Sequence, residues 1–283
     1  MEGTVVNLSD DAVAKVWHGR SRDDIRALAS FGSAVATASL PFSVGYVMDV
    51  LEDAELTISI ERKIHGQPLR PDGVPTPSVV DAEKVRLLGD VLEGFSRSVL
   101  SPGLASLPIL PGDHPFTWAG SFTESLADLV ERRFQAVPHL LQRDLDDGDA
   151  TVVAVTERLR GLKTTAQALI HGDLIPANVL IEGGHISGVL DFGFLTTVGD
   201  PQFDAAITAS IFDMYGPHGR ASEQALSEAF LDRFGHDRVS YGLYRAAYAL
   251  ITNAYFGQDG LDGHYAWCLR MLRRPDVTAP IVG

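Results

Sequence analysis

The sequence predicts an α+β fold, with antiparallel β-hairpins in its N-terminal part and helices through most of the rest. Two patterns support this prediction. β-rich runs alternate with turn residues over the first 62 residues, and apolar residues recur at helical intervals from residue 79 onward. A chain of 283 residues that is 45% hydrophobic can bury a substantial core, so we expect one large domain or two lobes.

The first hairpin is expected over residues 4–17, with a Ser-Asp-Asp turn between its strands. On the second strand Val13, Lys15 and Trp17 share one face, because alternate residues of a strand point the same way. Lys15 therefore has apolar neighbours. Its charge either meets a partner or extends to solvent at a sheet edge.

A helix is expected to follow at Ser21. Ser21 and Asp24 have the S-x-x-D spacing of a capping box, in which the Asp24 side chain would accept a backbone N–H at the helix start. A second hairpin, formed by residues 42–50 and 55–62, then leads through residues 61–68 into a proline-containing linker.

Helices are expected to dominate after residue 77. Their apolar periodicity covers residues 79–99, 122–145, 152–162, 221–234, 241–256 and 261–272. Asp200 directly precedes Pro201, which is typical of a helix start, so we expect Asp200 to be an N-cap residue.

A β-hairpin with a Gly-Gly turn is expected over residues 179–190, among these helices. A His-Gly-Asp tripeptide and Asn178 precede it, and an Asp-Phe-Gly tripeptide follows it. If the two glycines form the turn, Asn178 lies opposite Val189, and Asp191 lies on the diagonal of the same face. We therefore expect Asn178 and Asp191 to lie within reach of a shared cation.

These residue types, in this order, suit phosphoryl transfer. The reaction needs a carboxylate beside the acceptor hydroxyl and oxygen ligands for Mg²⁺. By the pattern of the kinase catalytic loop, Asp173 is the catalytic residue, and Asn178 and Asp191 are the metal ligands. Each tripeptide alone is typical of an ordinary turn or strand end, but their combination favours catalysis. His171 is expected to support the loop structurally.

The same motifs resemble those of a known family. Residues 169–180, 188–193 and 199–206 are similar, in sequence and order, to the central motifs of the aminoglycoside phosphotransferase and choline kinase-like family, relatives of the protein kinases. This resemblance implies a protein-kinase-like two-lobed fold. A small antiparallel-sheet, nucleotide-binding lobe would span residues 1–66, and a large helical lobe, with the catalytic loop and the acceptor site, would span residues 67–283. ATP or GTP would be the phosphoryl donor.

The resemblance also implies roles for other residues. Lys15 would contact the nucleotide phosphates, and Asp24 would be its partner, as an alternative to the capping box. Backbone groups of Arg62 and Ile64 would bind the adenine edge. Asp204 would brace the catalytic loop. Acceptor-binding groups would come from the C-terminal helices and loops, whose acidic residues include Asp213, Glu223, Asp259 and Asp262.

The start of the chain departs from the family pattern. A kinase-like fold opens with a strand, a phosphate-covering loop and a second strand, and the stretch before Lys15 has room only for the second strand. Either the nucleotide lobe is truncated, or another element replaces the loop, or the true start lies upstream.

Three functions are therefore open. The first is an NTP-dependent O-phosphotransferase acting on a hydroxyl of a small molecule, foremost an antibiotic, which would provide resistance or self-protection. The second is a small-metabolite kinase for choline, a sugar or an amino alcohol. For choline, an aromatic cage would be drawn from Tyr241, Tyr244, Tyr248, Tyr255, Phe256 and Trp267. The third is a pseudokinase-type nucleotide-binding protein, suggested by the missing loop.

Composition narrows the range of partners. A net charge of −14 argues against binding to nucleic acid or to an anionic membrane surface, and it suits a cationic acceptor. The single cysteine, Cys268, has no intrachain partner for a disulfide, and no apolar run reaches the roughly 20 residues of a membrane span. We therefore expect a soluble, cytoplasmic protein. The sequence leaves the oligomeric state undetermined.

Overall fold

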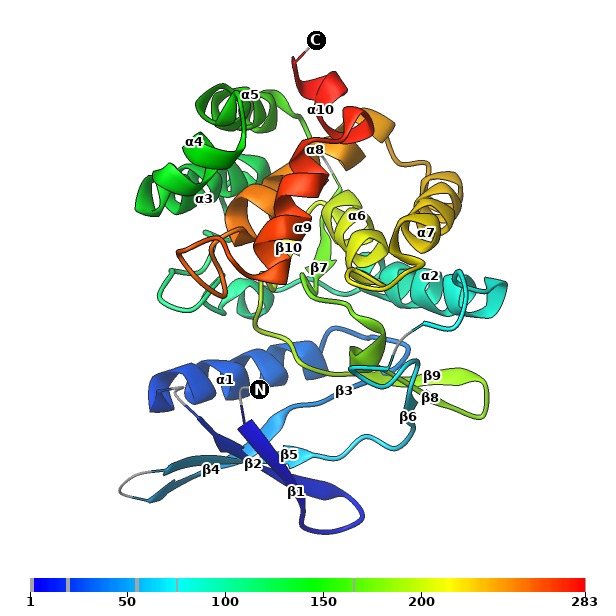
Figure 1. The fold of residues 1–283 in the computed structure, drawn as a ribbon. Helices are drawn as coiled ribbons and strands as arrows, with labels where there is room; N and C mark the ends of the chain where they lie inside the picture. The colour runs from blue at the N-terminus through cyan, green and yellow to red at the C-terminus, as the bar shows by residue number, and fades with distance from the viewer. Residues whose placement is uncertain (1–2, 19–20, 54–55, 75, 165, 283) are drawn as a thin grey trace. The chain divides into compact units, whose positions relative to one another are not determined.

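The computed structural model describes residues 3–18, 21–53, 56–74, 76–164 and 166–282 (Figure 1). The chain divides into two compact units. Residues 1–74, 86–118 and 168–199 form the first unit, and residues 75–85, 119–167 and 200–283 form the second. The first unit thus contains both the N-terminal sheet and the predicted catalytic segment. The lobe boundary after residue 66 stays a prediction.

A four-stranded antiparallel sheet in the order β1-β2-β5-β4 begins the first unit. Its strands are β1 (Gly3–Asn7), β2 (Ala12–Trp17), β4 (Val47–Asp53) and β5 (Leu56–Arg62). The first predicted hairpin is confirmed, since β1 pairs with β2. β2 pairs on its other side with β5, where Lys15 lies opposite Ser59. Lys15 is therefore on a central strand, which excludes the alternative of a lysine at a sheet edge.

A second sheet has the order β3-β9-β8-β6. Its strands are β3 (Ser43–Val44), β6 (Gln67–Pro68), β8 (Val179–Glu182) and β9 (His185–Val189). The predicted β8–β9 hairpin is confirmed at its turn, where Glu182 pairs with His185. Its predicted register further along was wrong, because a bulge at Ser187 shifts the pairing and places Val179 opposite Val189. The second N-terminal hairpin also starts later than expected, at Val47, since residues 43–44 belong to this other sheet.

Helices and a short strand pair complete the first unit. α1 (Arg22–Ala36) packs against β3 and β4, and most of α2 (Ala82–Ser96) belongs to the same unit. β7 (Ala168–Ile170) pairs with β10 (Thr197–Gly199). The candidate catalytic segment leaves β7 and returns at β10, so the two ends of this segment lie side by side.

The second unit is helical. Its helices are α3 (Phe122–Ala136), α4 (Pro138–Asp144), α5 (Gly148–Gly161), α6 (Pro201–Ile211), α7 (Gly219–Phe234), α8 (Arg238–Thr252), α9 (Gly263–Leu272) and α10 (Pro275–Val282). α8 packs against α3, α5, α6, α9 and α10, and is buried on all sides from Ser240 onward. The helix predicted over 122–145 is two helices, because Pro138 has no N–H to continue the first. None of the helices in the described ranges has the length and apolarity of a membrane span.

Candidate phosphotransfer site

His171 supports the loop from a buried position. It directly follows β7, and its side chain is 0% exposed. Its Nδ1 accepts the backbone N–H of Asp173 at 3.2 Å, so Nε2 carries the proton and donates it to the carbonyl of Leu190 at 2.8 Å. Burial lowers the pKa of His171 to about 4, so the ring is neutral at pH 7. Both ring nitrogens are engaged by backbone groups, as befits a structural residue.

Gly172 lets two backbone segments meet. Its φ is +83°, and a Cβ at this position would lie 2.7 Å from Leu195 Cβ and closer still to the carbonyl oxygen of Phe194. Thr196 joins the same two segments, since its hydroxyl donates to the carbonyl of His171 at 2.8 Å and accepts the backbone N–H of Gly193 at 2.8 Å. The His-Gly-Asp loop is thereby fixed against the residues that follow Asp-Phe-Gly.

Asn178 closes the loop. It ends a 3₁₀ turn (Pro176–Asn178), is 5% exposed, and donates through Nδ2 to the backbone carbonyl of Asp173 at 3.0 Å. Its own carbonyl accepts the N–H of Leu190 at 2.9 Å. Because Nδ2 is engaged, the side-chain oxygen Oδ1 is the atom of Asn178 that could bind a cation. The side chain of Asp173 itself is partly exposed.

Asp191 is positioned by the residue before it. Leu190 is held at both ends of its backbone, by Asn178 and by His171. Asp191 then adopts a left-handed conformation, with φ of +57°, which is uncommon for a residue with a side chain. Its Oδ1 lies 3.3 Å from Nζ of Lys15. Two residues 176 positions apart in the chain are thus brought into contact.

An aromatic cluster anchors the Asp-Phe-Gly segment. The ring of Phe192 lies 4.5 Å from the ring of His171, 5.3 Å from that of Phe31 on α1 and 6.0 Å from that of Phe95 on α2, centre to centre. Burial of these rings stabilises the segment that carries Asp191. Sequence reasoning missed Phe31 and Phe95, because nothing in the local pattern distinguishes them from ordinary core residues.

The donor set fits a divalent cation such as Mg²⁺. Asn178 offers an amide oxygen and Asp191 a carboxylate, the oxygen ligands that Mg²⁺ prefers. The Asp191 side chain is 62% exposed, which leaves access for water or phosphate oxygens as further ligands. Within the described ranges, no three His, Cys, Asp or Glu side chains cluster as a metal site. The candidate site combines carboxylate and amide groups instead.

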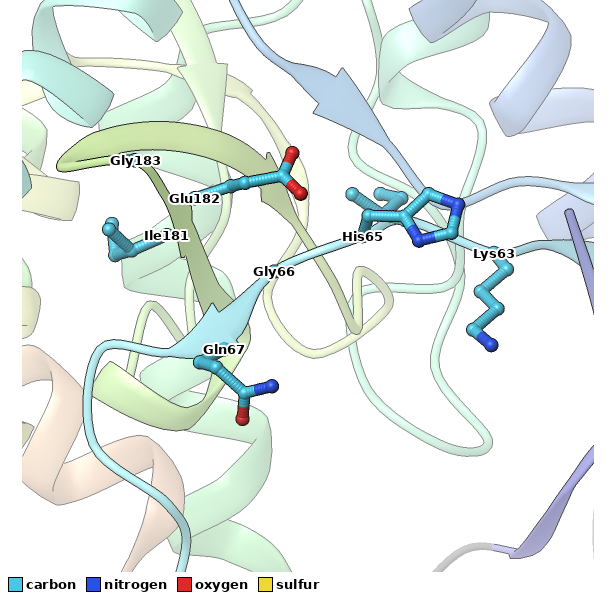
Figure 2. A pocket seen from close by; sticks show the side chains of 8 residues that line it. Lys63, His65, Gly66, Gln67, Ile181, Glu182 and Gly183 are labelled. Carbon is cyan, nitrogen blue, oxygen red and sulfur yellow. The ribbon is translucent and has the colours of Figure 1, made fainter. Parts of the chain in front are cut away.

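The predicted adenine connector borders a hollow. Arg62 ends β5, and its N–H donates to the carbonyl of Tyr46 at 3.1 Å. Ile64 packs close to Gly188 of β9 and lines a cavity of about 460 Å³ (Figure 2). The other residues that line it are Lys63, His65, Gly66, Gln67, Ile181, Glu182 and Gly183. In Figure 2 the Glu182 side chain extends toward the connector. The roles of Arg62 and Ile64 in base binding stay predictions.

The structure shows one of the two alternatives for Asp24. Its carboxylate accepts the N–H of Ser21 at 3.0 Å, and its own N–H donates to the Ser21 hydroxyl at 3.2 Å, which completes the capping box of α1. In the described part of the chain, the carboxylate in contact with Lys15 is that of Asp191, not that of Asp24. The prediction of Asp24 as the lysine's partner therefore has no support in this geometry.

Asp200 and Asp204 lie in the second unit. Asp200 caps α6 as predicted, since its Oδ1 accepts the N–H of Gln202 at 2.9 Å. Its Oδ2 accepts the hydroxyl of Tyr244 at 2.7 Å, and burial raises the pKa of the Asp200 carboxyl. Asp204 is 2% exposed on α6. Its bracing of the catalytic loop stays a prediction.

Several residues suggested for acceptor binding instead stabilise the second unit. Glu223 is 4% exposed and pairs with Arg245 at 3.1 Å and with Arg274 at 2.8 Å. Asp262 caps α9. The aromatic rings of Tyr241, Tyr244, Tyr248 and Trp267 are buried in the helical core. An open cage for a quaternary ammonium is therefore not built from these four rings.

The chain is similar to known proteins both in sequence and in fold. The model of the phosphotransferase enzyme family matches residues 4–248. No curated protein matches this chain at a significant level.

Solved structures with a similar fold include three phosphotransferases. A thermostable mutant of aminoglycoside phosphotransferase APH(4)-Ia, in a ternary complex with ADP and hygromycin B, is 16% identical over 99% of this chain and 94% of that chain, with a TM-score of 0.68. Macrolide 2'-phosphotransferase MphH from Brachybacterium faecium is 19% identical over 97% and 90%, with a TM-score of 0.55. Aminoglycoside phosphotransferase APH(3'')-Id from Streptomyces rimosus is 22% identical over 86% of both chains, with a TM-score of 0.52.

These likenesses confirm the predicted fold. It is a two-lobed, kinase-like α+β fold with a small antiparallel sheet near the N-terminus and a large helical part. The family match covers more than half of the chain and includes every residue of the candidate site. The chain belongs to the phosphotransferase enzyme family.

Proposed function

We propose that this protein transfers the γ-phosphoryl group of ATP or GTP to a hydroxyl of a small-molecule antibiotic. The observation that carries the proposal is the contact of Lys15 with Asp191 at 3.3 Å. Asn178 lies beside this contact, because its backbone carbonyl accepts the N–H of Leu190, the residue before Asp191. Membership of the phosphotransferase enzyme family supports the reaction class. The names of similar solved structures, which include aminoglycoside and macrolide phosphotransferases, support an antibiotic as acceptor.

Each residue of the site has a role in this proposal. Asn178 and Asp191 would hold Mg²⁺, which when bound neutralises charge on the phosphates. Lys15 would steady the nucleotide phosphates. Asp173 would orient the acceptor hydroxyl and accept its proton, with its backbone fixed by His171 and Asn178. The backbone groups of Arg62 and Ile64 would bind the adenine edge.

The setting of the reaction follows from charge and chemistry. A net charge of −14 favours a cationic acceptor over an anionic one. A nucleotide-dependent kinase needs ATP or GTP, so we place the protein in the cytoplasm. Inactivation of the antibiotic would serve resistance or self-protection.

One experiment tests the proposal directly. The protein is incubated with ATP or GTP, Mg²⁺ and a panel of aminoglycoside, macrolide, peptide and nucleoside antibiotics, together with choline and simple sugars. Mass spectrometry then detects gain of a phosphoryl group. Saturable phosphorylation of an antibiotic supports the proposal, and phosphorylation of choline or a sugar alone would favour a metabolite kinase instead. Nucleotide binding without transfer to any acceptor of the panel would indicate a pseudokinase-type nucleotide-binding protein.

A further inference from the structure

Lys15 has a second contact besides Asp191. Its Nζ lies 4.0 Å from the ring centre of Trp17, two residues further along β2. Trp17 is 6% exposed and the Lys15 side chain is 13% exposed, so both are largely shielded from water. A cation over an indole face is attracted by the ring quadrupole, and this attraction strengthens as water is removed. The indole is therefore a second group that holds the ammonium.

The indole is itself fixed in place. Its Nε1–H donates to the hydroxyl of Ser59 at 2.8 Å, and Ser59 donates to Glu61 Oε1 at 2.5 Å. Ser59 is 0% exposed and lies opposite Lys15 in the pairing of β2 with β5. Rotation of the indole would break a buried hydrogen bond, which is costly. Glu61, Ser59, Trp17 and Lys15 are thus joined in sequence by two hydrogen bonds and one cation–π contact.

The lysine needs such support because the two carboxylates considered as its partners, those of Asp24 and Asp191, have other roles. Kinases hold the corresponding lysine with an acidic residue on the next helix, but here Asp24 is engaged in the capping box of α1. Asp191 is a proposed Mg²⁺ ligand, and a carboxylate that binds a cation interacts less strongly with a neighbouring lysine. The contact with Trp17 does not depend on Asp191.

We propose that Trp17, oriented by Ser59, is a positioning residue that holds Lys15 in place for the nucleotide phosphates. It does so both when Asp191 pairs with Lys15 and when Asp191 binds the cation. This inference rests on the proposed function. It assigns the positioning of Lys15 to two residues, Trp17 and Ser59, that lie outside the His-Gly-Asp and Asp-Phe-Gly motifs.

Steady-state kinetics with four variants test the inference. Trp17→Leu removes the ring, Trp17→Phe keeps an aromatic face without the Nε1–H, and Ser59→Ala removes the group that fixes the indole. Trp118→Leu makes the same change at a tryptophan of the first unit that is 38% exposed. We expect Trp17→Leu to raise the nucleotide KM about five- to thirty-fold, with little change in the acceptor KM. Trp17→Phe should recover much of this loss, Ser59→Ala should show a smaller rise, and Trp118→Leu should match the wild type.

A purely structural role for Trp17 gives a different pattern. It would lower the folded fraction and leave the nucleotide KM of the folded enzyme unchanged, and the Phe and Leu variants would then have the same KM. That result would overturn the inference. Thermal melting identifies any variant that does not fold. If Trp17→Leu does not fold, the nucleotide KM values of Trp17→Phe and Ser59→Ala are compared with that of the wild type instead.

A second measurement does not require transfer. Without nucleotide, the rate at which an acetylating reagent modifies Lys15 is measured by mass spectrometry against the exposed Lys163. We expect modification of Lys15 to be several-fold faster in Trp17→Leu than in the wild type, and close to the wild-type rate in Trp17→Phe. Equal rates in all three proteins would refute the inference about Trp17. Absence of transfer by the wild type would instead refute the proposed function, so the two failures are distinguishable.

Discussion

Replacement of Gly172 by alanine probes how closely the catalytic loop approaches the Asp-Phe-Gly segment. With φ at +83°, any side chain at this position is strained by about 1–2 kcal/mol. The new Cβ would also overlap the carbonyl of Phe194 and lie 2.7 Å from Leu195 Cβ. Because backbone cannot yield as a flexible side chain does, overpacking adds about 1–3 kcal/mol. We expect Gly172→Ala to lower the free energy of unfolding by about 2–5 kcal/mol.

Gly184 provides a matched control for this substitution. Its φ is +80°, nearly that of Gly172, but a Cβ at Gly184 would meet no atom within 4 Å. Gly184→Ala should therefore carry the backbone strain alone, and any effect of the substitution on the unfolded chain is common to both variants. We expect the two variants, compared by urea denaturation, to differ by about 1–3 kcal/mol.

Activity should separate the two glycine variants as well. A forced shift at Gly172 moves Asp173 relative to Asp191, and a displacement near 1 Å can lower a reaction rate about 100-fold. Gly184→Ala leaves that distance unchanged, so phosphoryl transfer should stay near the wild-type rate. Equal stabilities and equal rates for the two variants would refute the close approach that we derive from the structure.

Four further predictions concern individual side chains. Asp173→Asn should stay folded and bind nucleotide but lose about 10²–10⁴-fold in turnover, whereas Asp72→Asn, at an exposed loop residue, should match the wild type in the same assay. Asn178→Asp removes the N–H donor to the Asp173 carbonyl, so urea denaturation should show a free energy of unfolding lower by about 1–3 kcal/mol. The variant keeps a side-chain oxygen for Mg²⁺, so calorimetry should still detect Mg²⁺-dependent nucleotide binding. Glu223→Ala removes the carboxylate that pairs with buried Arg245 and should lower the free energy of unfolding by about 3–5 kcal/mol in urea denaturation. The acceptor KM of the folded fraction should be unchanged. The pKa of His171 is about 4 in the folded protein and 6.5 in the unfolded chain, so the unfolded chain binds more protons between these pH values. The free energy of unfolding should therefore fall by at most about 3 kcal/mol as the pH is lowered from 6.5 to 4. In urea denaturation at a series of pH values, His171→Gln should show a smaller fall.

Local patterns predicted much of the fold. The hairpin at 4–17, the turn at Gly183 and Gly184, and the N-cap at Asp200 each depend on residues close together in the sequence, and each is present. The bulge at Ser187 was missed because the sequence pattern fits both pairings, with Asn178 opposite Val189 as predicted or with Val179 opposite Val189 as observed. A bulge depends on which atoms pack on both sides, and those atoms belong to distant segments.

The candidate site shows the same division between local and distant information. The spacing of Asp173, Asn178 and Asp191 along one segment was sufficient to propose a cation site. The partner of Lys15 was not predictable in this way, because Asp191 lies 176 positions away and Asp24 offered a nearer carboxylate. The helix start satisfies Asp24 locally, so that residue is not available to the lysine. Competition between a local cap and a distant ion pair is decided only by the folded structure.

The central claim is that Asn178 and Asp191 together hold a divalent cation beside Lys15. A crystal structure with a non-hydrolysable nucleotide and Mn²⁺ in place of Mg²⁺ tests it most directly, because anomalous scattering locates manganese independently of the protein atoms. We expect Mn²⁺ bonded to the Asp191 carboxylate and to Oδ1 of Asn178, with nucleotide phosphate among its other ligands and Lys15 in contact with the phosphates. Nucleotide bound with Mn²⁺ at other residues, or phosphates out of reach of Lys15, would contradict the account.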